Sequence, residues 1–360
     1  MKTRTFILSL TLAGMLAASL SANACTGITL NSKDSTTIVA RTIEWGGSDL
    51  NSQYVIVPRG YTMRSYTPDG SEGMQFTSRY GYVGLAVEQK EFIAEGINEA
   101  GLSAGLFYFP NYGQYEAYDA EKKDTSIADL QLVSWILGKC ATIDEAIESV
   151  KQVHVIRIDP RASTVHWRFT DPAGRQVVLE IIGGEPKFYE NKLGVLTNSP
   201  GFEWQLTNLN NYVNLYPGSA PTQSLGNVRL ASFGAGSGFL GLPGDVTPPS
   251  RFVRAAFYQA TAPRQDDAEK TVLQAFQILN NFDIPVGIEF ADGKVPADIP
   301  SATQWTSATD MKNRIIYFRT MYNSEIRSIN LDQIDFSEVA YQAIPLDNTK
   351  QQPIRAIPIK

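Results

Sequence analysis

The first 25 residues constrain this chain more than any other stretch, because they set where the folded protein begins. A basic N-terminus precedes an apolar run from Phe6 to Leu20, and Ala22-Asn23-Ala24 forms an A-x-A site. This is the pattern of a secretory signal peptide over residues 1–24. We therefore expect an exported protein, periplasmic or secreted, whose mature chain begins at Cys25. The alternative is an uncleaved anchor, but the apolar run is shorter than the roughly 20 residues that span a bilayer.

The net charge and the small numbers of histidine and cysteine residues limit the classes of function that this chain can have. Loss of Lys2 and Arg4 with the leader changes the formal net charge from −6 to −8. An acidic surface disfavours nucleic acid or anionic lipid as the main partner, so a small-molecule substrate is expected. The chain has two histidines and two cysteines, too few for a disulfide framework or a zinc site built from His and Cys. We expect no metal and no membrane span in the mature chain.

The mature chain alternates groups of strands with groups of helices. Short β-rich runs separated by turn residues follow Cys25 to about residue 109, and two helices are predicted next, over Thr125–Gly138 and Thr142–Val150. Later segments continue the pattern, with helices predicted over 202–216, 250–260 and 267–281 and strands over 303–309, 314–320 and 326–331. No repeat or linker interrupts this sequence, so we expect one domain over residues 25–360, with two packed sheets and helices outside.

Once the leader is removed, Cys25 carries a thiol and a free α-amine on one residue. An α-amine has a pKa of about 7.7 to 8, so it can accept the thiol proton and later return it to a leaving amine. Cys25 is then a nucleophile with its own base. Two alternatives stay open: a lipid anchor on Cys25 of a non-catalytic exported lipoprotein, and a disulfide with Cys140, a residue that a buried apolar position also explains.

A series of motifs follows Cys25 in a specific order: NEAGLSAGLFYFP, STVHW, GVLTNSP, FEW, NLN, GLPGD and SRF. Together they resemble the choloylglycine hydrolase and penicillin V acylase family of N-terminal nucleophile (Ntn) hydrolases. The resemblance covers essentially the entire mature chain. It implies an α+β fold, a four-layer αββα sandwich with two antiparallel sheets between helical layers. It also implies catalysis without a cofactor, and a homotetramer.

The resemblance places the family's functional residues on five positions, which are Cys25, Arg41, Glu44, Asn198 and Arg251. Cys25 would be the nucleophile. Arg41 near the thiol would lower the thiol pKa, Glu44 would hold the α-amine, and Asn198 would donate to the developing oxyanion. Without the family, Arg41 and Glu44 would be interpreted as a surface ion pair, Asn198 as a turn residue and Arg251 as a solvated helix residue.

Two positions depart from the pattern of bile-salt hydrolases. Glu44 stands where they have aspartate, and the segment 104–110, AGLFYFP, lacks the asparagine of their AGLNFP. A backbone N–H survives a side-chain replacement, so Phe107 or Tyr108 can still supply an oxyanion donor. Trp45 is expected to line the substrate pocket, although a core position explains a tryptophan equally well.

The predicted substrate is a conjugated bile salt, cleaved at the amide that joins it to glycine or taurine. Penicillin V and acyl-homoserine lactones are the alternatives, since each also presents an apolar acyl group beside an amide. The missing asparagine weakens the bile-salt prediction. The TNSP, NLNNY and GLPGD motifs, with a full-length segment between them, favour it.

Overall fold

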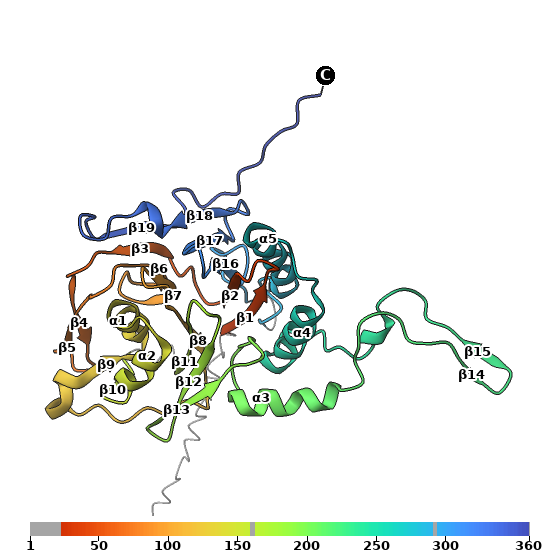
Figure 1. Cartoon of the computed structure of the whole chain (residues 1–360), viewed down its shortest axis with the longest axis horizontal. Coiled ribbons are helices and arrows are strands. Elements are labelled where there is room, and N and C mark those ends of the chain that lie inside the picture. The colour runs from red at the N-terminus through yellow and green to blue at the C-terminus, as the bar shows by residue number, and fades with distance from the viewer. Residues whose placement is uncertain (1–22, 159–162, 291–293, 360) are drawn as a thin grey trace, which may run out of the picture.

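The computed structural model describes residues 23–158, 163–290 and 294–359, and most of its strands form two antiparallel sheets (Figure 1). The predicted leader therefore lies outside the described residues, except for Asn23 and Ala24. The smaller sheet has five strands in the order β1-β2-β16-β17-β18. Their bounds are β1 (Asn23–Asn31), β2 (Thr37–Trp45), β16 (Thr303–Asp310), β17 (Ile315–Thr320) and β18 (Arg327–Asn330). The last three coincide with the strands predicted over 303–309, 314–320 and 326–331, and they pair as an antiparallel meander.

The larger sheet has eight strands in the order β13-β12-β11-β8-β7-β6-β3-β19. Their bounds are β13 (Glu185–Glu190), β12 (Gln176–Ile182), β11 (Val165–Thr170), β8 (Ser103–Tyr108), β7 (Ile93–Asn98), β6 (Tyr82–Ala86), β3 (Gln53–Val57) and β19 (Gln342–Pro345). The central strands β6, β7 and β11 are buried at every residue. Complete burial of these strands means that both faces of the sheet are covered here, so their polar side chains need partners in the interior.

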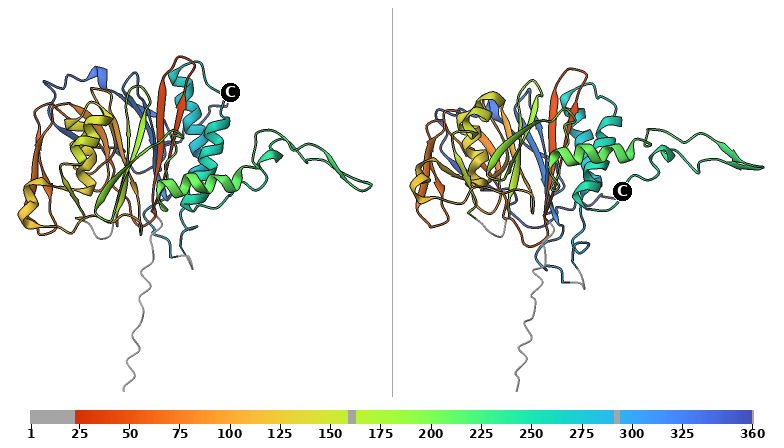
Figure 2. Two further views of the ribbon diagram at one scale, coloured as in Figure 1. Left: turned by 60° about the horizontal axis from the view of Figure 1, so that its bottom comes forward. Right: turned by 90° about the horizontal axis from the view of Figure 1, so that it is seen from below.

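Helices cover the outer face of each sheet. Helix α1 (Leu132–Lys139) packs on β7 and β8, and α2 (Ile143–Val150) lies beside it. On the other side, α4 (Pro248–Thr261) packs on β1, and α5 (Ala268–Leu279) packs on β2 and β16. Figure 2 shows the four layers edge-on, with β1 and β2 facing the larger sheet. The predicted αββα sandwich is confirmed.

Local signals explain where α2 and α5 begin. The side chain of Thr142 accepts a hydrogen bond from the Glu145 backbone N–H, and Asp267 accepts one from Lys270. Each cap satisfies an amide that has no partner within its helix. Both helices therefore begin within one residue of the predicted start. None of the helices within the described residues is long and apolar enough to cross a membrane.

Two predicted helices are wrong in part. Residues 126–128 form strand β9 (Ser126–Ala128), which pairs in parallel with β10 (His154–Ile156), so α1 begins only at Leu132. The pairing and a Ser65 hydroxyl that accepts from the Ala128 N–H satisfy this backbone without a helix. Helix α3 (Phe202–Asn208) ends well before Tyr216, and a 3₁₀ turn follows. Asparagines after residue 207 bond locally through their side chains, which competes with helix continuation.

Two hairpins lie outside the large sheets. Strands β4 (Thr62–Tyr66) and β5 (Glu72–Thr77) form one beside α1. The other, β14 (Gln223–Leu225) and β15 (Val228–Leu230), tips an arm over residues 213–240 that projects away from the sandwich (Figure 1). All residues of β14 and β15 are exposed.

Candidate active site

Cys25 is the third residue of β1, in the layer of the smaller sheet that faces β8. Its register partner on β2 is Ile43, so Arg41 and Glu44 flank the cysteine along the neighbouring strand. A bridge between Gly27 and Leu196 brings the segment that carries Asn198 against β1, and Arg251 reaches the same place from α4. The structure therefore gathers all five predicted residues around one sulfur atom, although 226 positions separate Cys25 from Arg251.

The Arg41 guanidinium contacts the thiol of Cys25. Its Nη2 lies 2.9 Å from Cys25 Sγ, and its Nη1 donates to the carbonyl oxygens of Ala94 and Leu106 at 3.0 and 2.5 Å. The side chain is fully buried, so the interpretation of Arg41 and Glu44 as a surface ion pair is wrong. Since backbone carbonyls of the larger sheet fix the guanidinium, its position relative to the sulfur is rigid.

Asn198 and Arg251 hold the backbone of Cys25. The Cys25 nitrogen donates to Asn198 Oδ1 at 2.9 Å, and Arg251 Nη2 donates to the same oxygen at 2.7 Å. Arg251 Nη1 also donates to the Cys25 carbonyl at 2.5 Å. Asn198 Nδ2 donates to the Tyr108 carbonyl at 2.7 Å, so one of its two amide hydrogens is already engaged. Arg251 is fully buried, and its interpretation as a solvated residue is wrong.

Glu44 is a buried carboxylate that is only weakly paired. Its side chain is 2 % exposed, and neither oxygen has a well-formed hydrogen bond among the described residues. Burial raises its pKa to about 7, while the charge of Arg251 and the Thr42 hydroxyl act in the opposite direction. In this chain the Cys25 nitrogen is still joined to Ala24, whose register partner is Glu44. A positive charge on that nitrogen would therefore lie on the strand next to this carboxylate.

The pKa of the Cys25 thiol is raised, because burial outweighs the opposing charges of Arg41 and Arg251. Arg41 acts in the predicted direction, but the expectation that it leaves the thiol with a lowered pKa is wrong. A buried thiol with a raised pKa stays protonated at neutral pH. Nucleophilic attack from this site therefore needs a base that removes the proton as the bond forms.

Tyr108 and Phe107 lie differently relative to the Cys25 sulfur. The Tyr108 backbone N–H hydrogen-bonds toward the Cys25 sulfur and lowers the thiol pKa. The Phe107 ring lies behind the site, with its centroid 4.1 Å from Arg41 Cζ. Phe109 stacks on His166 at 4.4 Å. The geometry thus favours Tyr108 over Phe107 as a donor to an oxyanion, and the Phe107 and Phe109 rings are both fully buried.

An apolar cavity of about 130 Å³ opens beside Cys25 and is named here the acyl cavity. Trp45 and Tyr108 line it, as the sequence predicts for Trp45. Most of its other walls are aliphatic or aromatic: Ile43, Leu50, Val87, Phe92, Leu106, Leu130 and Val165. Glu44, Glu88 and Gln89 complete the lining. An apolar group bound here would place an adjoining carbonyl next to the sulfur.

Sequence reasoning missed three charged residues of the site. Glu95 and Arg168 are 2 % and 1 % exposed and lie behind Arg41. Glu289 lies near Glu44, whose charge, together with burial, raises the Glu289 pKa to about 7. A signal was present for two of them, because Glu95 and Arg168 each stand between apolar neighbours in segments that the sequence predicts as strands. A charged residue at such a position is almost always paired in the interior.

The remaining cysteine and the histidines take no part in this site. Cys25 and Cys140 are both free and buried, so the disulfide alternative is wrong. His166 is held by Glu180 and by the Thr197 carbonyl, and His154 by Glu116. The described part of the chain holds no group of three or more His, Cys, Asp or Glu side chains arranged to bind a metal ion.

Comparison with known proteins places this arrangement in context. Residues 25–349 match the profile of the family described as linear amide C–N hydrolases, choloylglycine hydrolase family. A bile salt hydrolase/transferase of Clostridium perfringens is 31 % identical over 323 residues, which cover 88 % of this chain and 95 % of the relative. The match begins at the residue that the structure places at the centre of the site.

Solved structures give the same result. A crystal structure of a variant of conjugated bile acid hydrolase from Clostridium perfringens superposes with a TM-score of 0.80 at 28 % identity, covering 93 % of this chain and 100 % of that one. Penicillin V acylase from Agrobacterium tumefaciens has a TM-score of 0.71 at 23 % identity, covering 91 % of this chain and 93 % of that one. At that identity the second likeness concerns the fold.

Proposed function

Because this chain belongs to the choloylglycine hydrolase family of linear amide C–N hydrolases, we propose that it hydrolyses the amide bond of glycine- or taurine-conjugated bile salts. One observation carries the proposal. The Cys25 sulfur lies at the edge of the acyl cavity, and its own backbone nitrogen is held 2.9 Å from Asn198 Oδ1. Nucleophile, prospective base and acyl site thus meet at one residue.

The reaction follows from this placement. The Cys25 sulfur attacks the amide carbonyl carbon, the α-amine takes the thiol proton, and the carbonyl π electrons move to oxygen. The Tyr108 N–H stabilises the resulting oxyanion. The α-ammonium then gives its proton to the leaving nitrogen, the C–N bond breaks, and a thioester remains. Water then attacks the thioester carbonyl carbon while the α-amine accepts a proton from it. The C–S bond breaks, the α-ammonium returns the proton to the sulfur, and the bile acid is released.

Processing after Ala24 is part of the proposal, because an amide nitrogen cannot accept the thiol proton. The signal-like sequence before Cys25 and the family match that starts at Cys25 support it. Release of the α-amine also gives the weakly paired Glu44 carboxylate a cation. The mature enzyme is then an exported, periplasmic or secreted protein with one catalytic domain over residues 25–360.

The competing lipoprotein hypothesis predicts an acylated Cys25. The Cys25 side chain is 3 % exposed and contacts Arg41, so a diacylglyceryl group on the sulfur would have to displace the packed site. The intact mass of the protein isolated from its native host separates the two hypotheses. A plain chain that begins at Cys25 supports the enzyme, whereas an added diacylglyceryl mass rejects it.

The substrate is tested by measuring kcat/KM for glycocholate, taurocholate and penicillin V side by side with the mature enzyme. The proposal expects the two bile salts to exceed penicillin V by at least about tenfold, which corresponds to about 1.4 kcal/mol of transition-state binding. Cys25→Ala serves as the blank for each substrate. A higher kcat/KM for penicillin V would reject the substrate class and leave the amidase chemistry intact.

Penicillin V is the second candidate because of the cavity size. The acyl cavity holds about 130 Å³, whereas sites for drug-sized ligands usually enclose about 300–1,000 Å³. A phenoxyacetyl group is much smaller than a steroid, so it fits this volume with less rearrangement of the walls. A bile salt would need the segment around Val87 and Phe92 to open, or would leave part of the steroid outside the cavity.

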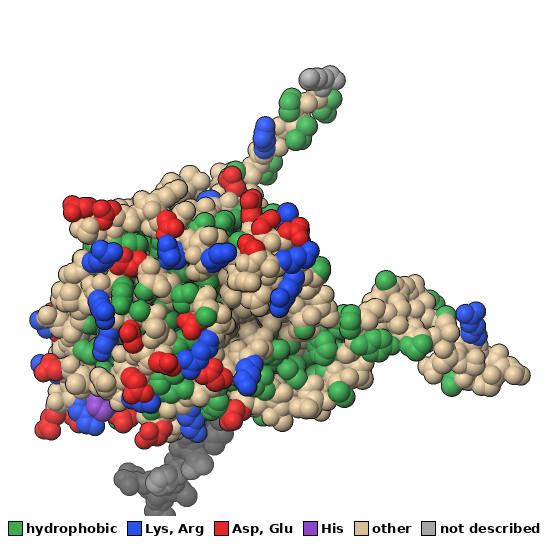
Figure 3. Space-filling model, in the orientation of Figure 1, with side chains coloured by type: hydrophobic (Ala, Val, Ile, Leu, Met, Phe, Trp, Pro, Cys, Tyr) green, Lys and Arg blue, Asp and Glu red, His purple; other side chains and the backbone are tan. Residues whose placement is uncertain are grey.

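The projecting arm supports a homotetramer. Several of its large apolar side chains are exposed, including Val213 at 88 %, Leu225 at 65 % and Phe233 at 112 %. Figure 3 shows hydrophobic side chains gathered at its base, beside the body of the molecule. A two-stranded hairpin with no covered face is only marginally stable in water, and apolar patches of this kind mark protein interfaces. Light scattering of the wild type and of Phe233→Ser with Leu225→Ser measures whether the assembly depends on the arm.

A further inference from the structure

Three charged side chains form a buried row behind the nucleophile. Arg41 Nη1 lies 3.6 Å from Glu95 Oε2, and Arg168 Nη2 lies 3.3 Å from the same carboxylate oxygen. All three side chains are at most 2 % exposed. We propose that Glu95 and Arg168 are positioning residues that, through the row they form with Arg41, set the charge that the Cys25 sulfur experiences. The proposal rests on the proposed role of Cys25 and names two residues that act on it through Arg41.

The sheet register builds the row. Glu95 on β7 and Arg168 on β11 are both register partners of Gly105 on β8, the strand between them. A methyl group at Gly105 would collide with the Glu95 carboxylate, so the missing side chain leaves the space in which the two charges meet. The Ser103 hydroxyl donates to Glu95 Oε1 at 3.3 Å. The carboxylate is therefore held in place from three strands.

The Phe107 ring contacts both arginines. Its ring centroid is 4.1 Å from Arg41 Cζ and 5.3 Å from Arg168 Cζ. A cation over an aromatic face is attracted to it, more strongly when it is desolvated. The ring thus helps to keep both guanidinium groups in place. This gives Phe107 a function that the sequence did not suggest.

Arg168 keeps an unused donor that points toward the nucleophile's own strand. Its Nη1 is buried and has no hydrogen-bond partner among the described residues. A Cβ at Gly27, two residues after Cys25, would lie 2.8 Å from that nitrogen. Residues two apart on a strand share one face, so the Arg168 charge lies beside the face of β1 that carries the thiol.

The row carries an excess of positive charge when the thiol is protonated. Two arginines flank one carboxylate, and a thiolate at Cys25 would neutralise the difference. The other groups that face the sulfur are Glu44 from β2, Arg251 from α4 and the Tyr108 N–H from β8. Burial of the row keeps solvent from screening it. Removal of the Arg168 charge and removal of the Glu95 charge should therefore shift the pKa of the Cys25 thiol in opposite directions.

The test measures the reactivity of the Cys25 thiol directly and needs no substrate. The rate of Cys25 alkylation by iodoacetamide is measured from pH 5 to 10 for the mature wild type, Arg168→Met, Glu95→Gln and the double variant. We expect Arg168→Met to raise the thiol pKa by about one unit and Glu95→Gln to lower it by a similar amount. At pH 6 these shifts correspond to about tenfold slower and tenfold faster alkylation. The double variant should return close to the wild type.

Controls keep the outcome decisive. The fully buried Cys140 must stay unmodified in every variant, because its alkylation would mean that the chain has opened. If Arg168→Met does not fold, Gly27→Ala replaces it. Its methyl would lie 2.8 Å from Arg168 Nη1 and 3.0 Å from the Phe107 ring, so it should push both away from β1 and raise the thiol pKa. Shifts of both single variants in one direction, or an unchanged titration in folded variants, would overturn the proposal. Failure of the bile-salt assay alone would not, because alkylation reports the sulfur whatever the substrate.

Discussion

Two cavities lie on either side of the loop from Trp45 to Ser52, and their comparison shows what distinguishes a reaction site from a surface recess. The acyl cavity encloses about 130 Å³ and includes Trp45 and Leu50 from this loop. The other, named here the polar cavity, encloses about 360 Å³ and includes Asp49, Asn51 and Ser52. Cys25, the proposed nucleophile, therefore lines the smaller of the two cavities.

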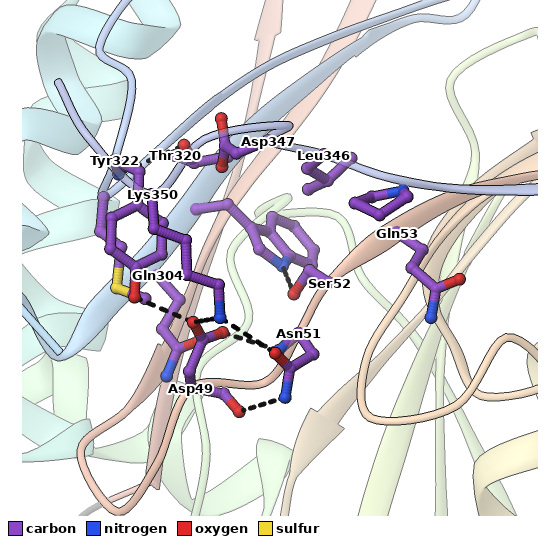
Figure 4. Close-up of a pocket in the computed structure, with 13 residues that line it drawn as sticks. Asp49, Asn51, Ser52, Gln53, Gln304, Thr320, Tyr322, Leu346, Asp347 and Lys350 are labelled. Carbon is purple, nitrogen blue, oxygen red and sulfur yellow. Dashed lines mark hydrogen bonds and ion pairs between the residues drawn. The ribbon is translucent and has the colours of Figure 1, made fainter. Parts of the chain in front are cut away.

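The charges of the two cavities differ in how they are paired. In the polar cavity Lys350 Nζ lies 2.6 Å from Asp49 Oδ2, and the Tyr322 hydroxyl donates to the same oxygen at 2.9 Å (Figure 4). Asp347 pairs with Arg327, which lies outside the cavity lining. Beside the acyl cavity neither oxygen of the Glu44 carboxylate has a well-formed hydrogen bond among the described residues. Paired charges at a surface do little chemistry, whereas buried and incompletely paired charges act strongly on a neighbouring group.

One side chain holds the loop between the cavities. Gln304 Oε1 accepts from the Leu50 N–H at 2.9 Å, and Gln304 Nε2 donates to the Trp45 and Ser48 carbonyls at 2.8 and 2.6 Å. Because these bonds go to the backbone, they fix the loop whatever its side chains are. Alternate residues of the loop can then line an apolar cavity on one side and a polar one on the other.

Substitution of Cys25, which lines only the acyl cavity, should have the largest effect on amide hydrolysis. Cys25→Ala removes the only sulfur at the acyl cavity, and we expect kcat for amide hydrolysis to fall by at least about 10³-fold. Circular dichroism and thermal unfolding should stay close to the wild type. Cys140→Ala is the matched control, because it removes the other cysteine away from the site and should keep activity. Substantial turnover by Cys25→Ala would place the chemistry elsewhere, including the polar cavity.

Retention of one residue before Cys25 should have the next largest effect. A chain that begins at Ala24 keeps the sulfur and Arg41 but converts the α-amine to an amide that cannot take a proton. We expect kcat to fall by about 10²–10⁴-fold, the usual contribution of a general base. Stopped-flow or end-point amide hydrolysis measures it against the chain that begins at Cys25. Equal rates for the two chains would assign the base to another group.

Glu44→Gln should change how stability depends on pH. Burial raises the Glu44 pKa from 4.5 to about 7 in the folded chain that retains Ala24. The folded state then binds more protons than the unfolded state between these pH values, so the free energy of unfolding falls as pH rises through this window and levels off above it. The variant should lose this slope and be more stable at pH 8 by on the order of 2 kcal/mol.

Urea unfolding between pH 4 and 8 measures the Glu44 effect, with the exposed Glu148→Gln as the control. The same substitution in the mature chain should cost stability, because there the carboxylate faces the α-ammonium. A flat pH dependence in the wild type that retains Ala24 would contradict the raised pKa.

A substitution in the polar cavity should have the smallest effect on activity. Lys350→Met removes the ion pair with Asp49, but the lysine side chain is 55 % exposed, and surface pairs contribute about 0–1 kcal/mol. We expect less than a twofold change in kcat/KM and a small loss of stability by thermal unfolding. A change of tenfold or more would mean that the loop transmits the state of the polar cavity to Leu50 and Trp45, and the two cavities would have to be treated as one site.

Much of this protein could be predicted from residues near in sequence or from motifs in order. The leader pattern points to Cys25 as a first residue, and the caps at Thr142 and Asp267 locate two helix starts. The five motif residues were gathered by the fold as expected. Local patterns succeed here because caps, turns and strand alternation depend on residues a few positions apart.

Only the tertiary structure decided the electrostatics of the site. Arg41 alone suggests a lowered thiol pKa, yet burial by the second sheet reverses the net direction. Tyr108 rather than Phe107 directs its N–H to the sulfur, and Glu95 meets Arg168 across Gly105 through strand register. Desolvation and charge pairing depend on which distant segments pack together. The sequence by itself therefore pointed to Cys25 as the proposed reacting residue, and long-range packing decided the charges around it.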